Sequence, residues 1–430
     1  MRLPRICLDG ELAKYLEQYR SCFSKPQYKY FVIILLGIVL NQSGFTLSGI
    51  LRQVSAEVTM SGASRFMSQA PWSASEVCQQ WQANFRIQMM AKVVAEHRRQ
   101  KAKQPKRPGR PRKTVVTGYL IGDDSVMQKR RGKKMGGLGH HYSATAEKTV
   151  RGHCLVQGLY VLLGRQCLLE PKLYRQKAVC EKEGLPFASK IELMIDLIGD
   201  FVPVSNTQTH VLLDSWYAAK KVWQAARSRE FLITCGIRNN RSLRIADPSS
   251  DKGWKWQKLS TYANSLDDND FVLTPWPRGE RQVYVHIVDT RIKKLYRCQL
   301  ICIREKLDGK TKFWASSDLA ADPQTLLVHI AQRWDIEVLF ADLKELLGID
   351  HYQLISAKAI HRFWVLAMVA YGFLEQQRAA LRLASARHIT IGDASRHVQR
   401  THWAHFLDWL HHHFVSQRSS ASDLYSVILH

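Results

Sequence analysis

The chain has 430 residues, of which 46% are hydrophobic and 10% aromatic. This composition is typical of a folded protein and excludes a predominantly disordered one. Lys and Arg number 62 against 37 Asp and Glu, which gives a formal net charge of +25. Such an excess indicates a polyanionic partner, because cations that neutralise phosphates release bound counterions. Nucleic acid is therefore the leading class of partner.

The strongest apolar run near the N-terminus is FVIILLGIVL at 31–40. A bilayer span needs about 20 residues, so we interpret this run as a buried helix. We expect no membrane association, and no secretory signal precedes the run. The nine cysteines are scattered without a CxxC pair, which indicates a reducing compartment. The expected location is cytoplasmic.

Residues 26–97 are predicted to be helical. Within them, TLSGILRQV and SGASRFMSQAPW predict two short helices joined by a turn, each begun by a Ser or Thr that can cap it. The pair could form a helix-turn-helix with Arg65 on its second helix, although small helical pairs are also common without DNA binding. We predict that residues 1–97 form a helical DNA-binding domain.

The segment 98–113, RRQKAKQPKRPGRPRK, carries nine Lys or Arg and no acid. Its prolines and glycine forbid a helix through its second half, so it is predicted to be an extended linker. The core KRPGRPRK resembles an AT-hook, whose arginines, here Arg107, Arg110 and Arg112, enter the minor groove of A·T-rich DNA. An ordinary solvated linker that contacts phosphates nonspecifically is an alternative that the sequence supports equally well.

Strand patterns follow the linker. VVTGYLIGDDSV, HCLVQGLYVLLG and QCLLEPKLY predict three strands, followed by a helix at 190–201, a strand THVLLDSW, a helix at 218–229 and a strand EFLITCGI. This order is the one expected of a ribonuclease-H-like α/β domain.

The stretch from about 237 to 317 is predicted to be β-rich and polar, with strands at RQVYVHIVDT, LYRCQLICIREK and TKFWASSD. Helices are expected to resume at Pro323 and to continue into the C-terminal tail. The β-rich stretch contains four tryptophans among many basic residues: Trp254, Trp256, Trp276 and Trp314.

Acidic residues occur at three separate places. Asp123 and Asp124 end the first predicted strand, Asp214 ends the fourth, and Glu337 lies in the segment 333–348. That segment, RWDIEVLFADLKELLG, is predicted to be a helix that is apolar nearly all round and hence buried. Converging carboxylates are what two divalent cations require for phosphodiester chemistry.

Arg333 and Lys344 would share one narrow stripe with Glu337, at about 40° and 20° from it around the helix. Each acid has a plain alternative: Asp214 as a helix N-cap, the Asp pair as a solvated turn, and Arg333 with Glu337 as an ordinary i,i+4 pair. Strand alternation sends Asp123 and Asp124 to opposite faces and does not choose between them.

At this point the sequence resembles a known family. RWDIEVLFADLK matches the Arg, Glu and Lys of the YREK signature of bacterial insertion-sequence DDE transposases, and DDS and LLDSWY match that family's two aspartate motifs. The chain is similar to the cut-and-paste, IS-four-like members over roughly residues 40–380. The family's tyrosine is replaced by Ile330, so no contact of that tyrosine carries over.

The resemblance implies an α/β fold, in which a ribonuclease-H-like catalytic domain is interrupted by a β-rich insertion and preceded by the helical DNA-binding domain. The expected boundaries are 1–97 for the helical domain, 98–113 for the AT-hook-like linker, 114–236 and 318–385 for the catalytic domain, 237–317 for the insertion, and 386–430 for a C-terminal helical region.

By the same resemblance, Asp124, Asp214 and Glu337 bind two Mg²⁺ ions, for which Mn²⁺ can substitute, and so form the catalytic site. The family's acidic residue directly followed by Ser or Thr favours Asp124 over Asp123. Arg333 and Lys344 are expected to hold phosphates of the transposon end. One of the four tryptophans is a candidate for stacking a flipped base at a hairpin end, although tryptophans in a β-domain are more often core residues.

The expected partners are double-stranded DNA, as terminal inverted repeats and target, and a second copy of the chain in a synaptic homodimer. A bacterial, nucleoid-associated location follows from the resemblance. Two alternatives remain: another ribonuclease-H-like DNA nuclease for junctions or repair, which would not join strands, and an inactive transposase-derived DNA-binding regulator. Histidines at 140–141 and 411–413 lack cysteines at ligand spacing, so no structural zinc site is expected.

Overall fold

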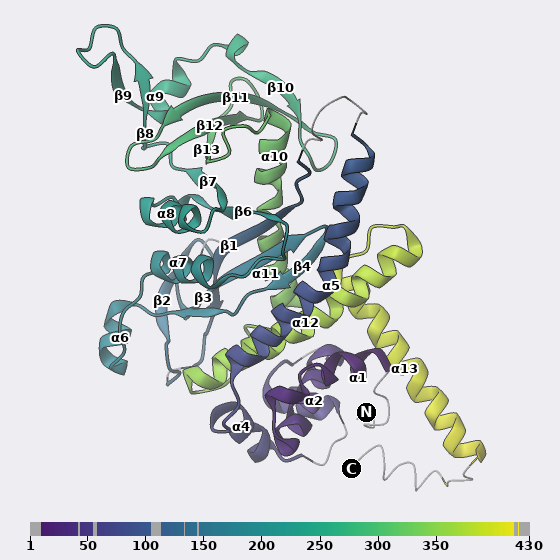
Figure 1. The fold of residues 1–430 in the computed structure, drawn as a ribbon. Helices are drawn as coiled ribbons and strands as arrows, with labels where there is room; N and C mark the ends of the chain where they lie inside the picture. Colours follow the sequence, from purple (N-terminus) through teal and green to yellow (C-terminus); the bar gives the residue numbers. More distant parts are fainter. Residues whose placement is uncertain are drawn as a thin grey trace.

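The computed structural model describes residues 10–41, 44–54, 58–104, 113–132, 134–143, 146–416 and 420. Helices of the N-terminal third lie at one end, a large mixed sheet forms the middle, and a β-rich region lies at the other end (Figure 1). The protein is therefore of mixed α/β class with N-terminal helices. Arg107, Arg110 and Arg112 lie outside the described residues, so the AT-hook-like interpretation stays a prediction.

The predicted N-terminal helices are present. They are α1 (Gly10–Glu17), η2 (Arg20–Cys22), α2 (Lys25–Leu40), α3 (Leu47–Gln53), α4 (Met60–Ser68) and α5 (Ala74–Ala102). Thr46 and Thr59 cap α3 and α4 by accepting hydrogen bonds from Gly49 and Gly62, so the second short helix begins one residue before the expected Ser61. The apolar run 31–40 is buried throughout its length in α2, as predicted. Within the described ranges, no helix combines the length and apolarity needed to cross a bilayer.

One sheet of 11 strands runs through the molecule in the order β10-β11-β12-β13-β7-β6-β1-β3-β2, with β4 and β5 also paired to β3. β6 is parallel to β1 and β7, and the other pairings are antiparallel. The first seven strands are β1 (Thr117–Gln128), β2 (Gly139–Ser143), β3 (Lys148–Leu162), β4 (Arg165–Leu168), β5 (Lys172–Tyr174), β6 (Gln208–Leu213) and β7 (Leu232–Ile237).

The long strands β1, β3, β6 and β7 confirm the predicted runs, and their order is consistent with a ribonuclease-H-like fold. The predicted third run, QCLLEPKLY, divides into the two strands β4 and β5. β2 and the short helix α6 (Lys177–Glu183) were not predicted from the sequence.

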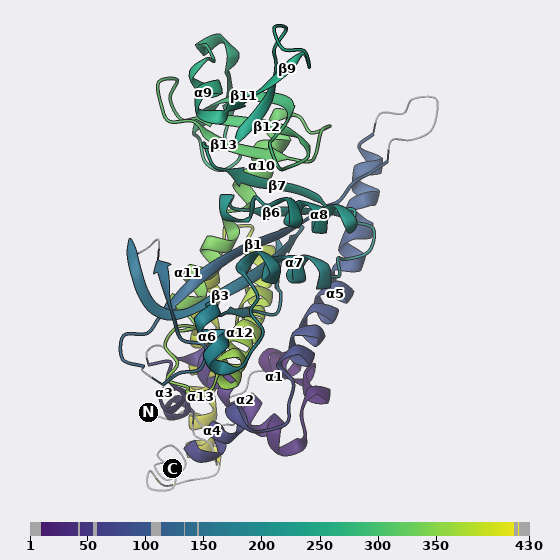
Figure 2. The same cartoon turned by 90° about the vertical axis from the view of Figure 1, so that its left-hand side faces the viewer.

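Helices cover both faces of the central strands. α7 (Lys190–Asp200) and α8 (Lys220–Ser228) pack against each other beside the sheet (Figure 2). Alternation along β1 separates the two faces: Gly122 lies against Met194 of α7, so closely that a Cβ would come within 2.5 Å of the sulfur. Three residues further along β1, Ser125 points to the opposite face and contacts Lys344 of α11 (Asp335–Glu345). Asp124 therefore belongs to the α7 face and Asp123 to the α11 face.

The β-rich stretch extends the central sheet. Its strands β10 (Val272–Pro275), β11 (Gln282–Arg291), β12 (Arg297–Arg304) and β13 (Lys312–Ser316) join the sheet because β13 pairs with β7, from Phe313 opposite Ile237 to Ser316 opposite Thr234. A separate hairpin, β8 (Ser242–Ala246) and β9 (Trp254–Lys258), precedes α9 (Leu259–Asn264) and η4 (Asp268–Asp270). The predicted strands are confirmed, and their continuity with the central sheet is the new feature.

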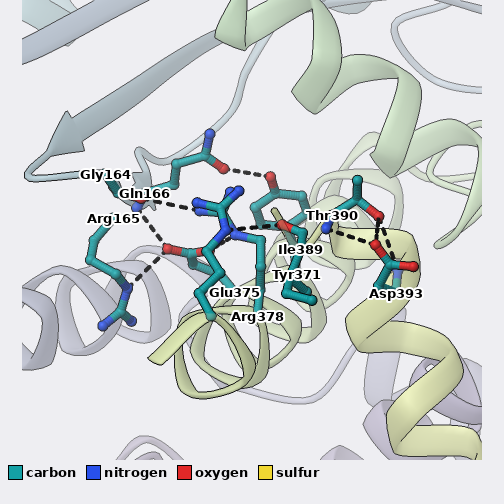
Figure 3. Close-up of polar contacts among 10 residues, drawn as sticks. Gly164, Arg165, Gln166, Tyr371, Glu375, Arg378, Ile389, Thr390 and Asp393 are labelled. Atoms are coloured by element: carbon teal, nitrogen blue, oxygen red, sulfur yellow. Dashed lines mark hydrogen bonds and ion pairs between the residues drawn. The ribbon is translucent and has the colours of Figure 1, made fainter. Parts of the chain in front are cut away.

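The long helix α12 (Ala357–Ser385) packs against α2, α4, α5 and β4, and so joins the N-terminal helices to the sheet. These elements contribute to one hydrophobic core. Glu375 of α12 is completely buried and accepts from Arg165, at 3.0 Å, and from Arg378, at 2.6 Å (Figure 3). Tyr371 donates to Gln166 beside it, and the chain continues into α13 (Ile391–Ser416). This polar network fixes the β3–β4 turn on α12.

Candidate active site

The acidic pair lies within β1 and not at its end as the sequence predicted, just past Gly122, where the pairing with β6 stops. The two carboxylates have different environments. The carboxylate of Asp124 accepts from the ammonium of Lys190 at 2.6 Å and from the hydroxyl of Tyr217 at 2.9 Å, and the thiol of Cys154 lies 3.4 Å away. Both of its oxygens therefore have protein partners. The carboxylate of Asp123 accepts from the backbone N–H of Asp124 at 2.8 Å and lies 3.5 Å from the guanidinium of Arg333.

Asp214 directly follows β6, and Gly122 of β1 pairs with Leu213 just before it. Its carboxylate accepts from the backbone N–H of Trp216 at 2.9 Å and so caps the short helix η3 (Ser215–Tyr217). Asp214 therefore does cap a helix, as the alternative interpretation of this residue predicted. A carboxylate offers about four lone-pair sites, so capping leaves capacity for a further ligand.

The regular helical hydrogen bonding is interrupted at Arg333, although the backbone dihedral angles there stay helical. Instead of one helix over 333–348, the structure has α10 (Pro323–Gln332) and α11, with Arg333 and Trp334 at the break between them. Trp334 is 55% exposed and Val338 is 45% exposed, so the prediction of a helix buried all round is wrong. The apolar pattern did not reveal the break, because residues on both sides of it still bury one face.

Arg333 links two of the acids. Its guanidinium donates to the carboxylate of Glu337 one turn along and also lies beside Asp123, which is distant in the sequence. The Arg333 side chain is only 14% exposed, so this is not an ordinary solvated surface pair. Lys344 donates to the hydroxyl of Ser125 at 2.8 Å. The expected stripe thus contacts β1 at two residues, Asp123 and Ser125.

The electrostatics of this cluster are those of crowded carboxylates. Burial, together with the neighbouring charges of Asp214 and Asp124, raises the pKa of Asp123 to about 7. Burial also raises the pKa of Asp214, with a further contribution from Asp124. Arg333 opposes both shifts. A group of acids in which protonation is favoured is a frequent feature of catalytic sites.

The donor set suits a hard divalent cation, because it offers carboxylate oxygens that repel one another without a cation between them. Arg333 and Lys190 supply positive charge in the present arrangement. Within the part of the chain that the structure describes, no group of three or more His, Cys, Asp or Glu side chains forms a metal-holding cluster as it stands.

Two of the four candidate tryptophans line a cavity beside the acids. Trp276 and Trp314, together with Trp334, border a cavity of about 550 Å³, into which Arg278, Arg281 and Arg333 also face. The buried Ile330, at the position of the family's tyrosine, is part of the same wall. Trp254 and Trp256 lie instead on β9 and pack edge-to-face with each other at 5.5 Å between ring centroids.

The remaining predicted DNA contact, Arg65, lies exposed in the last turn of α4. Sequence reasoning missed Lys190, Tyr217, Trp216 and Trp334. The last three lie within three residues of Asp214 or Arg333, so the aromatic residues near these positions were a usable signal. No local signal pointed to Lys190.

Comparison with known proteins identifies the family of the chain. The family described as DDE superfamily endonuclease matches residues 18–260, and the family described as transposase DDE domain matches residues 188–373. Since the first match spans more than half of the chain, the protein belongs to the DDE superfamily of endonucleases and transposases. Membership implies phosphodiester cleavage with divalent metal. The IS-four-like and bacterial assignments stay predictions.

No curated protein matches the chain. Among solved structures, the chain is similar to a protein in the cryo-EM structure of the piggyBac transposase synaptic complex with hairpin DNA. The sequence identity is 9% and the TM-score 0.42, over 90% of this chain and 72% of that one.

Proposed function

We propose that the protein is a cut-and-paste DDE transposase, which binds the ends of its element, cleaves the DNA there and joins the freed 3′-OH ends to target DNA. The observation that carries the proposal is the link made by Arg333. Through this one guanidinium, the carboxylate of Asp123 on β1 and the carboxylate of Glu337 lie around the same point, beside Asp214.

In this proposal, Asp214, Glu337 and one aspartate of the pair hold two Mg²⁺ ions, for which Mn²⁺ can substitute. Bound there, such ions would supply activation of the attacking water or 3′-OH and charge stabilisation of the leaving oxygen. Arg333 is displaced from the carboxylates and holds a phosphate of the DNA strand, for which its planar donor fork is suited. Lys344 supports β1 through Ser125.

Different observations support Asp123 and Asp124 as the metal ligand. The family motif favours Asp124, because a serine follows it directly. The contacts favour Asp123, because it lies on the α11 face next to Arg333, whereas both oxygens of Asp124 are occupied by Lys190 and Tyr217. On the basis of these contacts, we assign the ligand to Asp123 and a supporting role to Asp124.

The cavity of Trp276, Trp314 and Trp334 suits a base removed from the stack. A hairpin intermediate strains its terminal bases, and an aromatic surface stabilises a base that has been flipped out. Arg281 lies 4.5 Å from the ring centroid of Trp276, and Arg333 lies 6.0 Å from that of Trp314, so cations accompany both rings. These positions favour Trp276 and Trp314 over Trp254 and Trp256 for base stacking.

We further propose that Arg65, in the N-terminal helices, and the basic linker with Arg107, Arg110 and Arg112 contact the element's ends. An element has two ends, so a complex that cuts and joins both needs at least two copies of the chain. A homodimer is the smallest assembly that meets this requirement.

The decisive experiment uses the full-length protein and a plasmid that carries the DNA flanking its gene. We expect Mg²⁺-dependent nicking at the element ends, followed by joining to a target plasmid. Glu337→Gln should abolish both reactions while DNA binding in a gel-shift assay is retained, since only the site chemistry is changed. Glu345→Gln, an exposed acid on the same helix, is the matched control and should behave as wild type.

Retention of nicking by Glu337→Gln would overturn the proposed site. Cleavage without joining would instead identify a nuclease of the same fold, and binding without cleavage by the unaltered chain would identify a DNA-binding regulator. Either result would overturn the transposase proposal.

A further inference from the structure

A second cavity lies on the other side of Asp214. Its volume is about 490 Å³, and its walls include Ser215, Trp216, Arg238, Asn240 and Arg241. It is formed by η3 and by the chain that leaves β7, next to the first turn of α7. Gly236 of β7 permits this arrangement, because a Cβ there would lie only 3.1 Å from the backbone nitrogen of Ser215.

Trp216 dominates this cavity and is not a core residue. Its side chain is 55% exposed, although exposing an indole ring to water is unfavourable. Its backbone N–H donates to the carboxylate of Asp214, and this contact holds Trp216 close to the candidate active site. An exposed ring on a rigid support is a typical stacking surface for a base.

Cations surround the ring. The guanidinium of Arg238 lies 5.3 Å from the ring centroid of Trp216, and the ammonium of Lys190 lies 5.7 Å from it. Among the described residues, Arg238 has no carboxylate partner, and it is exposed. Arg241 donates to the carbonyl of Ala218, which orients its side chain. Positive charge beside an aromatic face is the combination that binds a base together with its phosphate.

A third cavity connects the two aromatic ones. It has a volume of about 370 Å³ and is lined by Asp214, Ser215, Trp314 and Arg333, among others. It shares Trp314 and Arg333 with the cavity of Trp276 and Trp334, and it shares Ser215 with the cavity of Trp216. The three cavities therefore follow one another, with the acidic residue in the middle and aromatic rings at both ends.

We propose that this succession of cavities is the track of one DNA strand, and that the Trp216 cavity binds the nucleotide next to the cleaved phosphodiester. The base stacks on Trp216, and its phosphate pairs with Arg238. The nucleotide on the opposite side of the cleaved bond occupies the cavity of Trp276, Trp314 and Trp334. The inference rests on the proposed function, since it takes the cleaved bond to lie at Asp214.

The test uses duplexes of the element end with 2-aminopurine at the nucleotide on one side or the other of the cleavage position found in the nicking assay. The full-length Glu337→Gln protein is used, so that the DNA stays intact. We expect Trp216→Ala to remove the fluorescence change at one position only, and Trp314→Ala to remove it at the other only. Trp216→Phe should restore most of the signal, because a phenyl ring still stacks.

Affinity supplies a second readout. For a single-stranded oligonucleotide that contains one 2-aminopurine, Trp216→Ala should weaken binding roughly tenfold. Arg238→Ala should weaken it and lower the dependence of log Kd on log salt by about 0.7, as expected when one phosphate contact to a single strand is lost. Trp403→Ala removes a 40% exposed tryptophan on α13 and is the matched control, expected to change nothing.

Unchanged affinity and unchanged fluorescence in Trp216→Ala would overturn the inference, whatever the nicking assay gives. An equal loss at both positions would overturn the assignment to one side of the bond. If the unaltered protein does not nick DNA, the proposed function fails by itself. The single-stranded titration then still decides whether the Trp216 cavity binds a nucleotide.

Discussion

The ammonium of Lys190 lies 2.6 Å from a carboxylate oxygen of Asp124, in a contact that joins the first turn of α7 to the middle of β1. Both side chains are largely buried, at 19% and 17% exposure. Removing only one partner of such a charge pair is strongly destabilising, because the remaining charge is left in a poorly solvated place.

Lys190→Met should therefore destabilise the metal-free protein by about 2 kcal/mol, since Asp124 loses a charged hydrogen-bond partner. Adding Asp124→Asn should recover part of this loss, because the uncompensated carboxylate is then gone. Unfolding in urea of the two single variants and the double variant measures the coupling. Lys220→Met, an exposed lysine on α8, is the control. Additive single effects would show that the pair is not coupled.

The two aspartates of the pair should respond differently in the cleavage assay. If Asp123 is the ligand, Asp123→Asn should lower nicking by about 100-fold or more, whereas Asp124→Asn should have a smaller effect through its support of Lys190 and Tyr217. Both variants should still bind DNA in a gel shift. The reverse order of effects would return the ligand assignment to Asp124, as the sequence motif indicates.

Glu375 should be important for stability and not for the chemistry. Glu375→Gln leaves Arg165 and Arg378 without their carboxylate in a fully buried place, and we expect a loss of about 3 kcal/mol or more. Thermal unfolding measures the loss, with the exposed Glu181→Gln on α6 as the control. An unchanged unfolding midpoint would mean that the network contributes nothing net.

Acid should destabilise the protein through His153. This side chain is completely buried, bonded to the carbonyl of Gly136 and to the hydroxyl of Tyr352, and burial lowers its pKa to about 4. The unfolded chain, with a usual pKa near 6.5, binds the proton more readily between pH 6.5 and 4. The free energy of unfolding should therefore fall as the pH decreases through this range, by up to about 3 kcal/mol from this residue.

His153→Gln removes this titration, so its unfolding free energy should depend less on pH between 6.5 and 4 than that of the wild type. Urea unfolding at several pH values measures the difference between the two slopes. Other buried histidines, such as His329, contribute equally to both proteins and cancel. Identical slopes would contradict the assignment.

The elements that the sequence predicted correctly are those with a strong local signal. β3, β6 and β7 are long apolar runs, and α7 begins with a capping box formed by Ser189 and Glu192. β2 was missed because GHHYS has no apolar alternation and is a strand only by pairing with β3. The pairing of β13 with β7 joins segments far apart in the chain, and no local pattern specifies such a contact.

The candidate active site was likewise predictable only where the sequence carries a local signal. Acids that follow apolar strands could be found from their positions alone, as with Asp214. Their partners could not, because Lys190 and Tyr217 lie 66 and 93 residues along the chain from Asp124. The break at Arg333 also escaped prediction, since Trp334 and Val338 are apolar residues on an exposed surface.

The pairing of β13 with β7 means that the β-rich region is not a removable attachment. β7 is an inner strand only because β13 hydrogen-bonds along its outer side. A shortened chain lacking that region would present the backbone N–H and C=O groups of β7 to solvent, where they could recruit a strand from another molecule. Such a truncation is therefore expected to self-associate, so engineered miniature versions should keep β13 or cap the new edge with charged residues.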